Sequence, residues 1–377
     1  DRSNADGLFA IQTRIATAIA HALGAEITAE EQDRIDRVPR HSSAAHARYL
    51  RARDEGRRTR FAAALFDLDA ALELDPGFAD ARSWRAYIYA FGQITSNARM
   101  MLLNDARFTA DTDFQSLALA EASRALELDA GSGVAWLTRA VTHEFHFRVQ
   151  EAREAFQRAH SLSPNDVDIL AEYAGCEALC GNPQAALVRV GRATRLDPGG
   201  PLTLYSSAIV QMAAGAADEA LASLARALSL DPANPEVHVL AGLFSPDPAA
   251  AVRFIRTAEE LDSAMLLPGI ALGYRRLGLE GDASRVLDRY EHWVRGGPGP
   301  AGPAEWAQYY LLRGDLARTR DWLHEAIAKL ERGEADQGFY ALVFSFLSQN
   351  EPWGSEPRFR ELLSRLECLK SRGSIRR

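Results

Sequence analysis

The sequence predicts an all-α protein in which pairs of antiparallel helices stack side by side into a solenoid. Two observations predict this fold: a short phrase of the type Leu-Asp-Pro returns at a regular distance, and alanine recurs at fixed positions before it. The length of 377 residues agrees with it, because it is too long for one compact core but ordinary for a solenoid, whose units pack only on their neighbours.

The period of the phrase identifies the type of repeat. Its last residue is Pro76, Ala130, Pro164, Pro198, Pro232 and Ser263 in the six successive copies. From position 130 to position 232 these residues are 34 apart each time, which is the length of a tetratricopeptide repeat. The sequence therefore predicts a right-handed superhelical solenoid of tetratricopeptide-type helix pairs.

Small residues at fixed positions explain how the helices of a pair can cross closely. Alanine lies twelve and five residues before the end of every phrase, with an apolar residue between them. The alanines are Ala64, Ala71, Ala118, Ala125, Ala152, Ala159, Ala186, Ala193, Ala220, Ala227, Ala251 and Ala258. Spacings of four and seven put them on one helix face, and only small residues allow helix axes to approach at the lower end of the usual range. Ala140, Ala174 and Ala208 supply the matching position on the preceding helix.

The elements follow in chain order. Residues 1–41 are expected to hold a docking helix, over 7–23, and a linker, because Leu8, Ile11, Ile15, Ile19 and Leu23 form an apolar stripe at helical spacing. Residues 42–263 are expected to form six repeats, with an insertion over 96–113. The predicted helix pairs cover about 42–75, 79–129, 133–163, 167–197, 201–231 and 235–262.

The last third of the chain departs from the repeat. Residues 264–332 are expected to form two degenerate helix pairs, separated by a Gly/Pro-rich linker over 296–303. Residues 333–377 are expected to form capping helices near 336–349 and 357–369, which cover the apolar end of the stack.

Composition limits the partners and the compartment. A net charge of -8 argues against a nucleic acid held by phosphate contacts, and no apolar run is long enough to span a membrane. Three cysteines cannot build a disulfide framework in a chain of this size. We expect a cytoplasmic protein, or a periplasmic one if the full-length protein has an upstream membrane segment. The chain begins with Asp1 and not with methionine, which suggests a fragment, so the opening helix docks either on the first repeat or on a missing upstream domain.

Motifs that could support catalysis or metal binding are weak. His143, Glu144 and His146 form His-Glu-x-His, whereas a zincin-type motif needs two histidines four residues apart. Cys176 and Cys180 share one helix face but have no further ligands at a suitable spacing, so they are better explained as small buried residues. We therefore expect no catalytic activity, no metal and no cofactor.

The order of several segments resembles a known family. These segments are 8–12 with 19–23, Ala47–Arg53, Ala71–Ala79 and the tail around Glu356–Phe359. They resemble the C-terminal repeat region of bacterial signalling proteins whose N-terminal output is a class III adenylate cyclase or a winged-helix DNA-binding domain. The resemblance implies a sensory or regulatory role and brings no catalytic residues with it.

A ligand is expected on the concave face, which the first helix of each pair lines. Counting inward positions along these helices gives ten candidates, for which ordinary packing between repeats is the alternative. They are Tyr49, Arg53, Arg85, Tyr89, Leu137, Val141, Glu144, Tyr205, Ile209 and Met212. The sequence thus predicts a scaffold for a protein or peptide partner, with self-association through the groove or terminal helices as a further outcome. The alternative is the sensory half of a signalling protein that binds a small ligand or partner.

Overall fold

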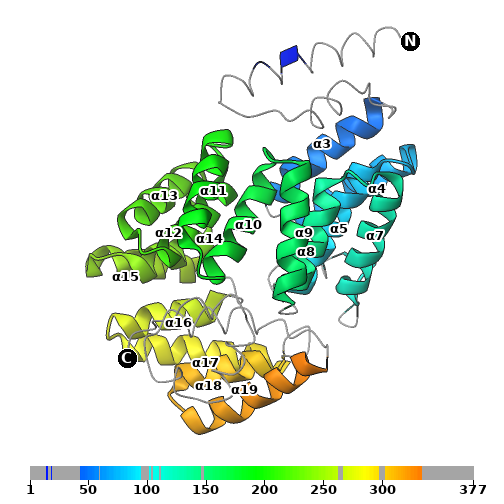
Figure 1. The fold of residues 1–377 in the computed structure, drawn as a ribbon. Helices are drawn as coiled ribbons and strands as arrows, with labels where there is room; N and C mark the ends of the chain where they lie inside the picture. The colour runs from blue at the N-terminus through cyan, green and yellow to red at the C-terminus, as the bar shows by residue number, and fades with distance from the viewer. Residues whose placement is uncertain are drawn as a thin grey trace.

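The structure, a computed structural model, describes residues 14, 15, 18, 43–58, 60–94, 102, 105–109, 112–145, 148–261, 266–296 and 302–332. These residues contain sixteen α-helices and no β-strand (Figure 1). The all-α prediction is confirmed.

The helices form eight antiparallel pairs that follow one another along the chain, each pair packed along its length. They are α3 (Ser43–Arg57) with α4 (Phe61–Leu74), α5 (Ala79–Ile94) with α7 (Phe114–Leu128), α8 (Gly133–Phe145) with α9 (Val149–Leu162), α10 (Val167–Leu179) with α11 (Pro183–Leu196), α12 (Pro201–Ala213) with α13 (Ala217–Leu230), α14 (Pro235–Phe244) with α15 (Pro248–Glu260), α16 (Leu267–Arg276) with α17 (Glu280–Gly296), and α18 (Pro303–Arg313) with α19 (Leu316–Glu331).

The stack curves with its first helices on the inside. Each second helix packs against the first helix of the next pair, and first helices of successive pairs also touch at most steps, as in α5 with α8 and α10 with α12. Second helices of successive pairs do not pack on each other to a comparable extent. Such a stack is concave on the side of the first helices, as in a solenoid.

The predicted alanines lie where the helices cross. All twelve alanines of the second helices are at most 2% exposed, which confirms their role in packing. The first helix of all eight pairs has alanine or glycine where it crosses the second helix, although the sequence had indicated such a residue in only three pairs. Its residues, each of them buried, are Ala52, Ala86, Ala140, Ala174, Ala208, Gly242, Gly273 and Ala307.

Two of these positions require glycine. A Cβ atom on Gly242 would lie 2.6 Å from both Cδ1 and Cγ1 of Ile255, and one on Gly273 would lie 2.8 Å from Cγ1 of the same side chain. Ile255 is fully buried, so it is held between α14 and α16. The sixth and seventh pairs therefore pack more closely than alanine would allow.

The Leu-Asp-Pro phrase ends the second helices through its aspartate. Asp75 has an extended backbone, with φ -148 and ψ 92, and its N–H donates to the carbonyl oxygen of Ala71 at 2.9 Å. Its side chain accepts a hydrogen bond from the Gly77 N–H at 3.0 Å. Asp129 makes the same two kinds of hydrogen bond although Ala130 and not proline follows it. The turn therefore does not depend on the proline alone.

The turn between the helices of several pairs uses glycine in the left-handed region. Gly181 and Gly215 have φ values of 78 and 79. Residues other than glycine rarely adopt this conformation. Gly278 and Gly314 do the same in the seventh and eighth pairs, so the degenerate pairs keep the turn of the regular ones.

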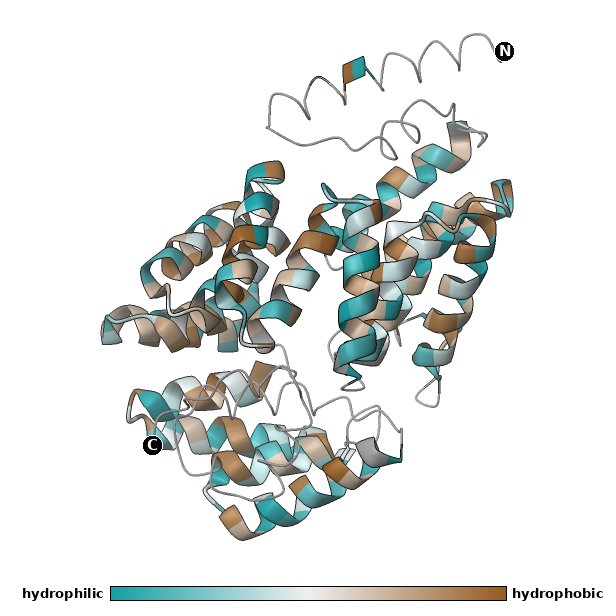
Figure 2. Cartoon of the chain, in the orientation of Figure 1, coloured by the Kyte–Doolittle hydropathy of each residue, from teal (hydrophilic) through white to brown (hydrophobic). Residues whose placement is uncertain are grey.

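The buried core consists of local clusters that follow one another along the solenoid. Hydrophilic and hydrophobic residues are mixed along the helices, as expected where each helix buries one face (Figure 2). The first cluster extends from α3 to α10, and the next ones join α10 to α12, α12 to α15 and α14 to α18. Helix α10 belongs to two of them, because Ile169 and Tyr173 face the first cluster and Ala174 faces the next.

Several predicted segments lie outside the described residues, including the capping helices near 336–349 and 357–369. Of the opening helix, only Arg14, Ile15 and Ala18 are described, and they are helical and exposed. The division at residues 41, 263 and 332 therefore remains a prediction. None of the described helices is long and apolar enough to cross a membrane.

Candidate binding surface on the inner helices

The inner surface of the first pairs is in contact with α10. Arg53 and Arg57 of α3 reach two carboxylates at the start of α10, more than a hundred residues further along the chain. Arg57 Nη2 lies 3.1 Å from Asp168 Oδ2, and Arg53 Nη2 lies 3.4 Å from the same atom and 3.6 Å from Asp166 Oδ2. The first and fourth pairs are thus joined by ion pairs across the inside of the solenoid.

A second polar contact joins α10 to α5. The Tyr87 hydroxyl donates a hydrogen bond to Glu172 Oε1 at 3.1 Å. Burial raises the pKa of Glu172 to about 7, with the hydrogen bond from Tyr87 opposing the shift and the Asp168 carboxylate adding to it. This carboxyl group therefore changes its charge near neutral pH.

Arg53, one of the predicted ligand residues, takes part in this contact, and its guanidinium also lies 6.0 Å from the ring centroid of Tyr49, another of them. Tyr49 is 7% exposed, and its ring centroid lies 5.1 Å from that of Phe78. Burial raises the pKa of Tyr49 well above its usual range. The Arg53 guanidinium lies over the Trp84 ring at 5.1 Å from the centroid. In this structure Arg53 faces α10, whereas Tyr49 packs against the start of the second pair.

Arg85 and Tyr89 lie elsewhere and are joined to other elements. Arg85 pairs with Asp69 of α4 at 2.7 Å and with Glu121 of α7 at 2.8 Å. The Tyr89 ring contacts Phe108 and Phe114, with centroids 5.9 and 6.2 Å away. Arg107 also forms an ion pair with Asp69. These two predicted ligand residues therefore help to hold the insertion of the second pair.

Leu137, Val141 and Glu144 lie inside the third pair. Leu137 and Val141 are fully buried, and Glu144 is 9% exposed. Leu137 and Val141 pack in the first core cluster. Neither of these two offers surface to a ligand in this arrangement, because both side chains are enclosed by the core cluster.

Tyr205, Ile209 and Met212 of α12 are half-buried and form an apolar surface on the inner side. Tyr205 and Met212 pack against the core cluster of α12 to α15 without being enclosed by it. Burial, with the nearby Glu236 of α14, raises the pKa of Tyr205 above its usual range. On α10, which packs against α12, a Cβ atom on Gly175 would meet nothing within 4 Å. The fourth pair thus leaves open space at this position of its first helix.

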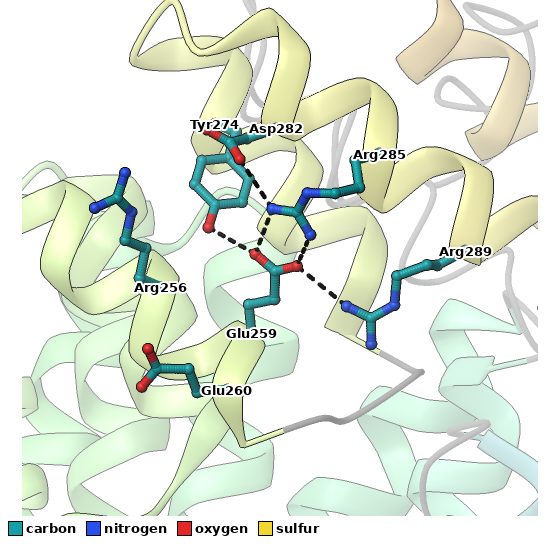
Figure 3. A pocket seen from close by; sticks show the side chains of 7 residues that line it. All are labelled: Arg256, Glu259, Glu260, Tyr274, Asp282, Arg285 and Arg289. Carbon is teal, nitrogen blue, oxygen red and sulfur yellow. Dashed lines mark hydrogen bonds and ion pairs between the residues drawn. The ribbon is translucent and has the colours of Figure 1, made fainter.

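The sequence did not indicate a depression of about 550 Å³ on the outer side, between α15 and α17 (Figure 3). Glu259 lies at its centre and accepts hydrogen bonds from Tyr274 at 2.7 Å and Arg289 at 3.1 Å. Arg285 also pairs with Glu259 and bonds Asp282 at 2.9 Å. The hydrogen bond from Arg285 is the main reason that the pKa of Glu259 is lowered. The residues that line the depression are Arg256, Glu259, Glu260, Tyr274, Asp282, Arg285 and Arg289. Arginines and carboxylates are equal in number among them, so we interpret the cluster as a set of ion pairs that joins the sixth and seventh pairs.

The side chains considered for metal binding are dispersed or enclosed. The part of the chain that the structure describes contains no group of three or more His, Cys, Asp or Glu side chains that could hold a metal ion. His146 lies outside that part. Cys176 and Cys180 are both buried, with their Sγ atoms 4.0 Å apart, and pack in the first core cluster.

No protein-family model matches the sequence, and a comparison with curated proteins found no relative. Solved structures with similar folds include PilF of Pseudomonas aeruginosa, which is 14% identical, with 63% of this chain and 99% of that chain covered and a TM-score of 0.42. A tetratricopeptide repeat protein from Parabacteroides merdae is 13% identical over 74% of this chain and 100% of that chain, with a TM-score of 0.42. YrrB, a TPR protein with an unusual peptide-binding site, is 19% identical over 52% of this chain and 92% of that chain, with a TM-score of 0.33.

These similarities identify neither a partner nor an activity. The period, the alanine positions and the eight helix pairs together make this chain an all-α solenoid of tetratricopeptide-type repeats. The comparisons give no support to the resemblance to adenylate cyclase or winged-helix signalling proteins.

Proposed function

We propose that this chain is a scaffold that binds a protein or peptide partner and has no catalytic activity of its own. The observation that supports this best is the half-buried apolar surface of Tyr205, Ile209 and Met212 on the inner side of α12. Most large apolar residues at equivalent inner positions of the earlier pairs are buried within the chain, whereas these three keep accessible surface.

The surface has the features of a peptide site. A tyrosine, an isoleucine and a methionine provide apolar contact area, and aromatic residues contribute strongly to binding energy at interfaces. Methionine adapts to different partner shapes because its side chain is unbranched and flexible. The neighbouring helix α10 leaves further room at Gly175, where a Cβ atom would meet nothing within 4 Å. An extended segment or a helix with apolar side chains at regular spacing fits this surface.

The proposal is tested by replacing Tyr205 with a photo-crosslinking phenylalanine analogue and identifying what is captured from lysate. The same analogue at Val188, which is 72% exposed on the second helix α11, is the matched control. We expect a specific product at position 205 only. Its partner, once purified, should bind the Tyr205→Ala and Met212→Ala variants at least tenfold more weakly than the wild type. Equal capture at both positions, or unchanged affinity in both variants, would show that the inner surface of α12 is not the binding site.

A role as the sensory half of a signalling protein is a second proposal, supported by the order of segments around residues 8–23 and Ala47–Arg53. In that case a bound partner or small ligand would alter the curvature of the solenoid and act on an upstream domain. The sequence of the full-length gene tests this directly. A cyclase or winged-helix domain upstream would support the proposal, and a start codon just before Asp1 would refute it.

A further inference from the structure

Helices α12 and α14, the first helices of the fifth and sixth pairs, do not pack closely on each other. The first helices of every other two successive pairs pack against each other to a greater extent. Tyr205 and Met212 of α12 and Leu240 of α14 pack against one shared core cluster and are half-buried. Apolar side chains of both helices therefore remain accessible to a further segment.

The inner helices of this part of the solenoid carry carboxylates and no permanent positive charge. Helices α10, α12 and α14 contain no lysine or arginine, and their acidic residues are Asp168, Glu172, Glu177 and Glu236. The arginines of the same three pairs belong to the second helices α11, α13 and α15, and they are Arg189, Arg192, Arg195, Arg226, Arg253 and Arg256. The charge of the inner side is thus set by its carboxylates and by the cations that reach them from elsewhere.

The three carboxylates of α10 have partners on other helices. Glu177 pairs with Arg189 of α11 at 2.6 Å, and Asp168 pairs with Arg57 of α3 at 3.1 Å. Glu172 accepts its hydrogen bond from α5, on the side of the first pairs. These contacts belong to the junctions of α10 with its neighbours and leave the surface of α12 aside.

Glu236, in the first turn of α14, is the carboxylate that acts on the surface of α12. It is half-buried, and its charge adds to the effect of burial in raising the pKa of Tyr205. Two basic side chains contact α14 at other places. His238 bonds the carbonyl oxygen of Pro232 at 2.8 Å, and Arg276 of α16 bonds that of Leu243, which lies seven residues, or about 10 Å, along the helix from Glu236.

We propose that the inner surface of α12 and α14 binds a partner segment that combines apolar residues with lysine or arginine. Its apolar side chains pack on Tyr205, Met212 and Leu240, and its cation pairs with Glu236. A cation at this place also meets the Tyr205 ring, and both attractions are stronger at a half-buried site than in open solvent. This inference rests on the proposed function, because it takes the same surface and names the chemical class of the partner.

The test uses the full chain and three labelled, blocked peptides that differ only in charge. They contain Leu-Lys-Leu-Lys-Leu, Leu-Gln-Leu-Gln-Leu and Leu-Glu-Leu-Glu-Leu between the same Gly-Ser flanks, and their binding is measured by fluorescence anisotropy. Glu236→Gln removes the charge and keeps the shape of the side chain. Glu219→Gln is the matched control, because Glu219 is exposed on the second helix α13.

We expect the wild type to bind the lysine peptide at least tenfold more tightly than the glutamine peptide, and the glutamate peptide more weakly than both. Glu236→Gln should lower the affinity for the lysine peptide to that for the glutamine peptide, and leave the latter unchanged. Glu219→Gln should bind all three peptides like the wild type. Failure of the lysine peptide to bind, equal binding of the lysine and glutamine peptides, or equal losses in Glu236→Gln and Glu219→Gln would overturn the proposal.

Hydrogen exchange of the wild type locates the site without any substitution, in case Glu236→Gln fails to fold. Saturating lysine peptide should slow exchange of the amides of α12 and α14 and leave those of α4 unchanged. Slowing spread evenly over the chain would show non-specific attraction to its net negative charge and would refute the proposal.

The failure of this inference can be told apart from the failure of the proposed function. Tyr205→Ala should weaken the lysine and glutamine peptides alike, because it removes apolar contact area. If crosslinking at position 205 captures a partner whose bound segment has no lysine or arginine, the inference fails and the scaffold proposal stands. If Tyr205→Ala changes neither peptide affinity and no product forms at position 205, the proposed function fails as well.

Discussion

The same substitution, glycine to alanine, should have opposite effects at two positions of the inner helices. Gly175 lies inside α10, and a Cβ atom there meets nothing within 4 Å. Alanine loses less backbone entropy than glycine on folding, so Gly175→Ala should stabilise the protein by about 0.5–1 kcal/mol. Gly242 lies inside α14, where the same gain is opposed by contact with Ile255.

The size of this opposing effect follows from the geometry. Carbon atoms in ordinary contact are about 3.5–4.0 Å apart. The new Cβ would lie 2.6 Å from two atoms of Ile255, so that side chain would have to move by roughly 1 Å. It is fully buried, and Gly273 lies on its other side, so it cannot move freely. Such overpacking costs about 1–3 kcal/mol, which exceeds the gain, and Gly242→Ala should destabilise the protein by about 0.5–2 kcal/mol.

The assay is urea unfolding followed by circular dichroism, together with hydrogen exchange in α14 to α16, because a solenoid does not always unfold in one step. Ile255→Val removes the Cδ1 atom and should cost about 0.5–1.5 kcal/mol alone. Combined with Gly242→Ala it should cost less than the sum, since the loss of Cδ1 removes one of the two close contacts and leaves only the one at Cγ1. The reasoning would be refuted if Gly242→Ala were as stable as the wild type, or if the two substitutions were additive.

Three further predictions concern packing and pH. Ala186→Leu should overpack the crossing of α10 and α11, where Ala186 is fully buried, and lower the free energy of unfolding by about 1–3 kcal/mol; unchanged thermal stability would count against the alanine alignment. The folded-state pKa of Glu172 is raised to about 7 from the usual 4.5, so folding favours the protonated form. The wild type should therefore lose stability relative to Glu172→Gln as pH rises from about 4.5 to 7. The loss should be on the order of 1–3 kcal/mol in this half-buried site. Urea titrations between pH 4.5 and 8.5 measure this, and parallel curves for the two proteins would exclude it. The pKa of His160 is lowered to about 4, by burial first and then by Arg189 and Arg192. The wild type should therefore lose stability relative to His160→Gln as pH drops from about 6.5 to 4, and urea titrations extended to pH 4 measure this difference.

Much of the fold could be predicted because the repeat imposes a local rule. A helix crossing needs small residues wherever it occurs, so the alanines recur and can be aligned without a structure. The rule also explains what was missed. Gly242, Gly273 and Ala307 obey the same steric requirement, but the pairs that contain them lack the Leu-Asp-Pro phrase or the 34-residue spacing by which positions were counted. In α17, Tyr290 occupies the position that the second recurring alanine has in the earlier pairs, and it is still buried, so the packing continues after the pattern has faded.

The candidate site was less predictable because it depends on contacts between distant repeats. A repeat pattern assigns the same inward positions to every inner helix. It therefore predicts the same ligand contact for Tyr49, Leu137 and Tyr205. The structure separates them: α10 crosses the inner side of the first pairs and pairs with Arg53 and Arg57, while α12 keeps accessible apolar surface. The curvature that brings α10 to α3 is a sum of small rotations over several pairs, and no single spacing in the sequence records it. The local signal in the sequence consists of two segments of opposite charge: an Asp-x-Asp sequence at the start of α10 and two arginines four residues apart on α3. Only the folded solenoid brings these two segments together.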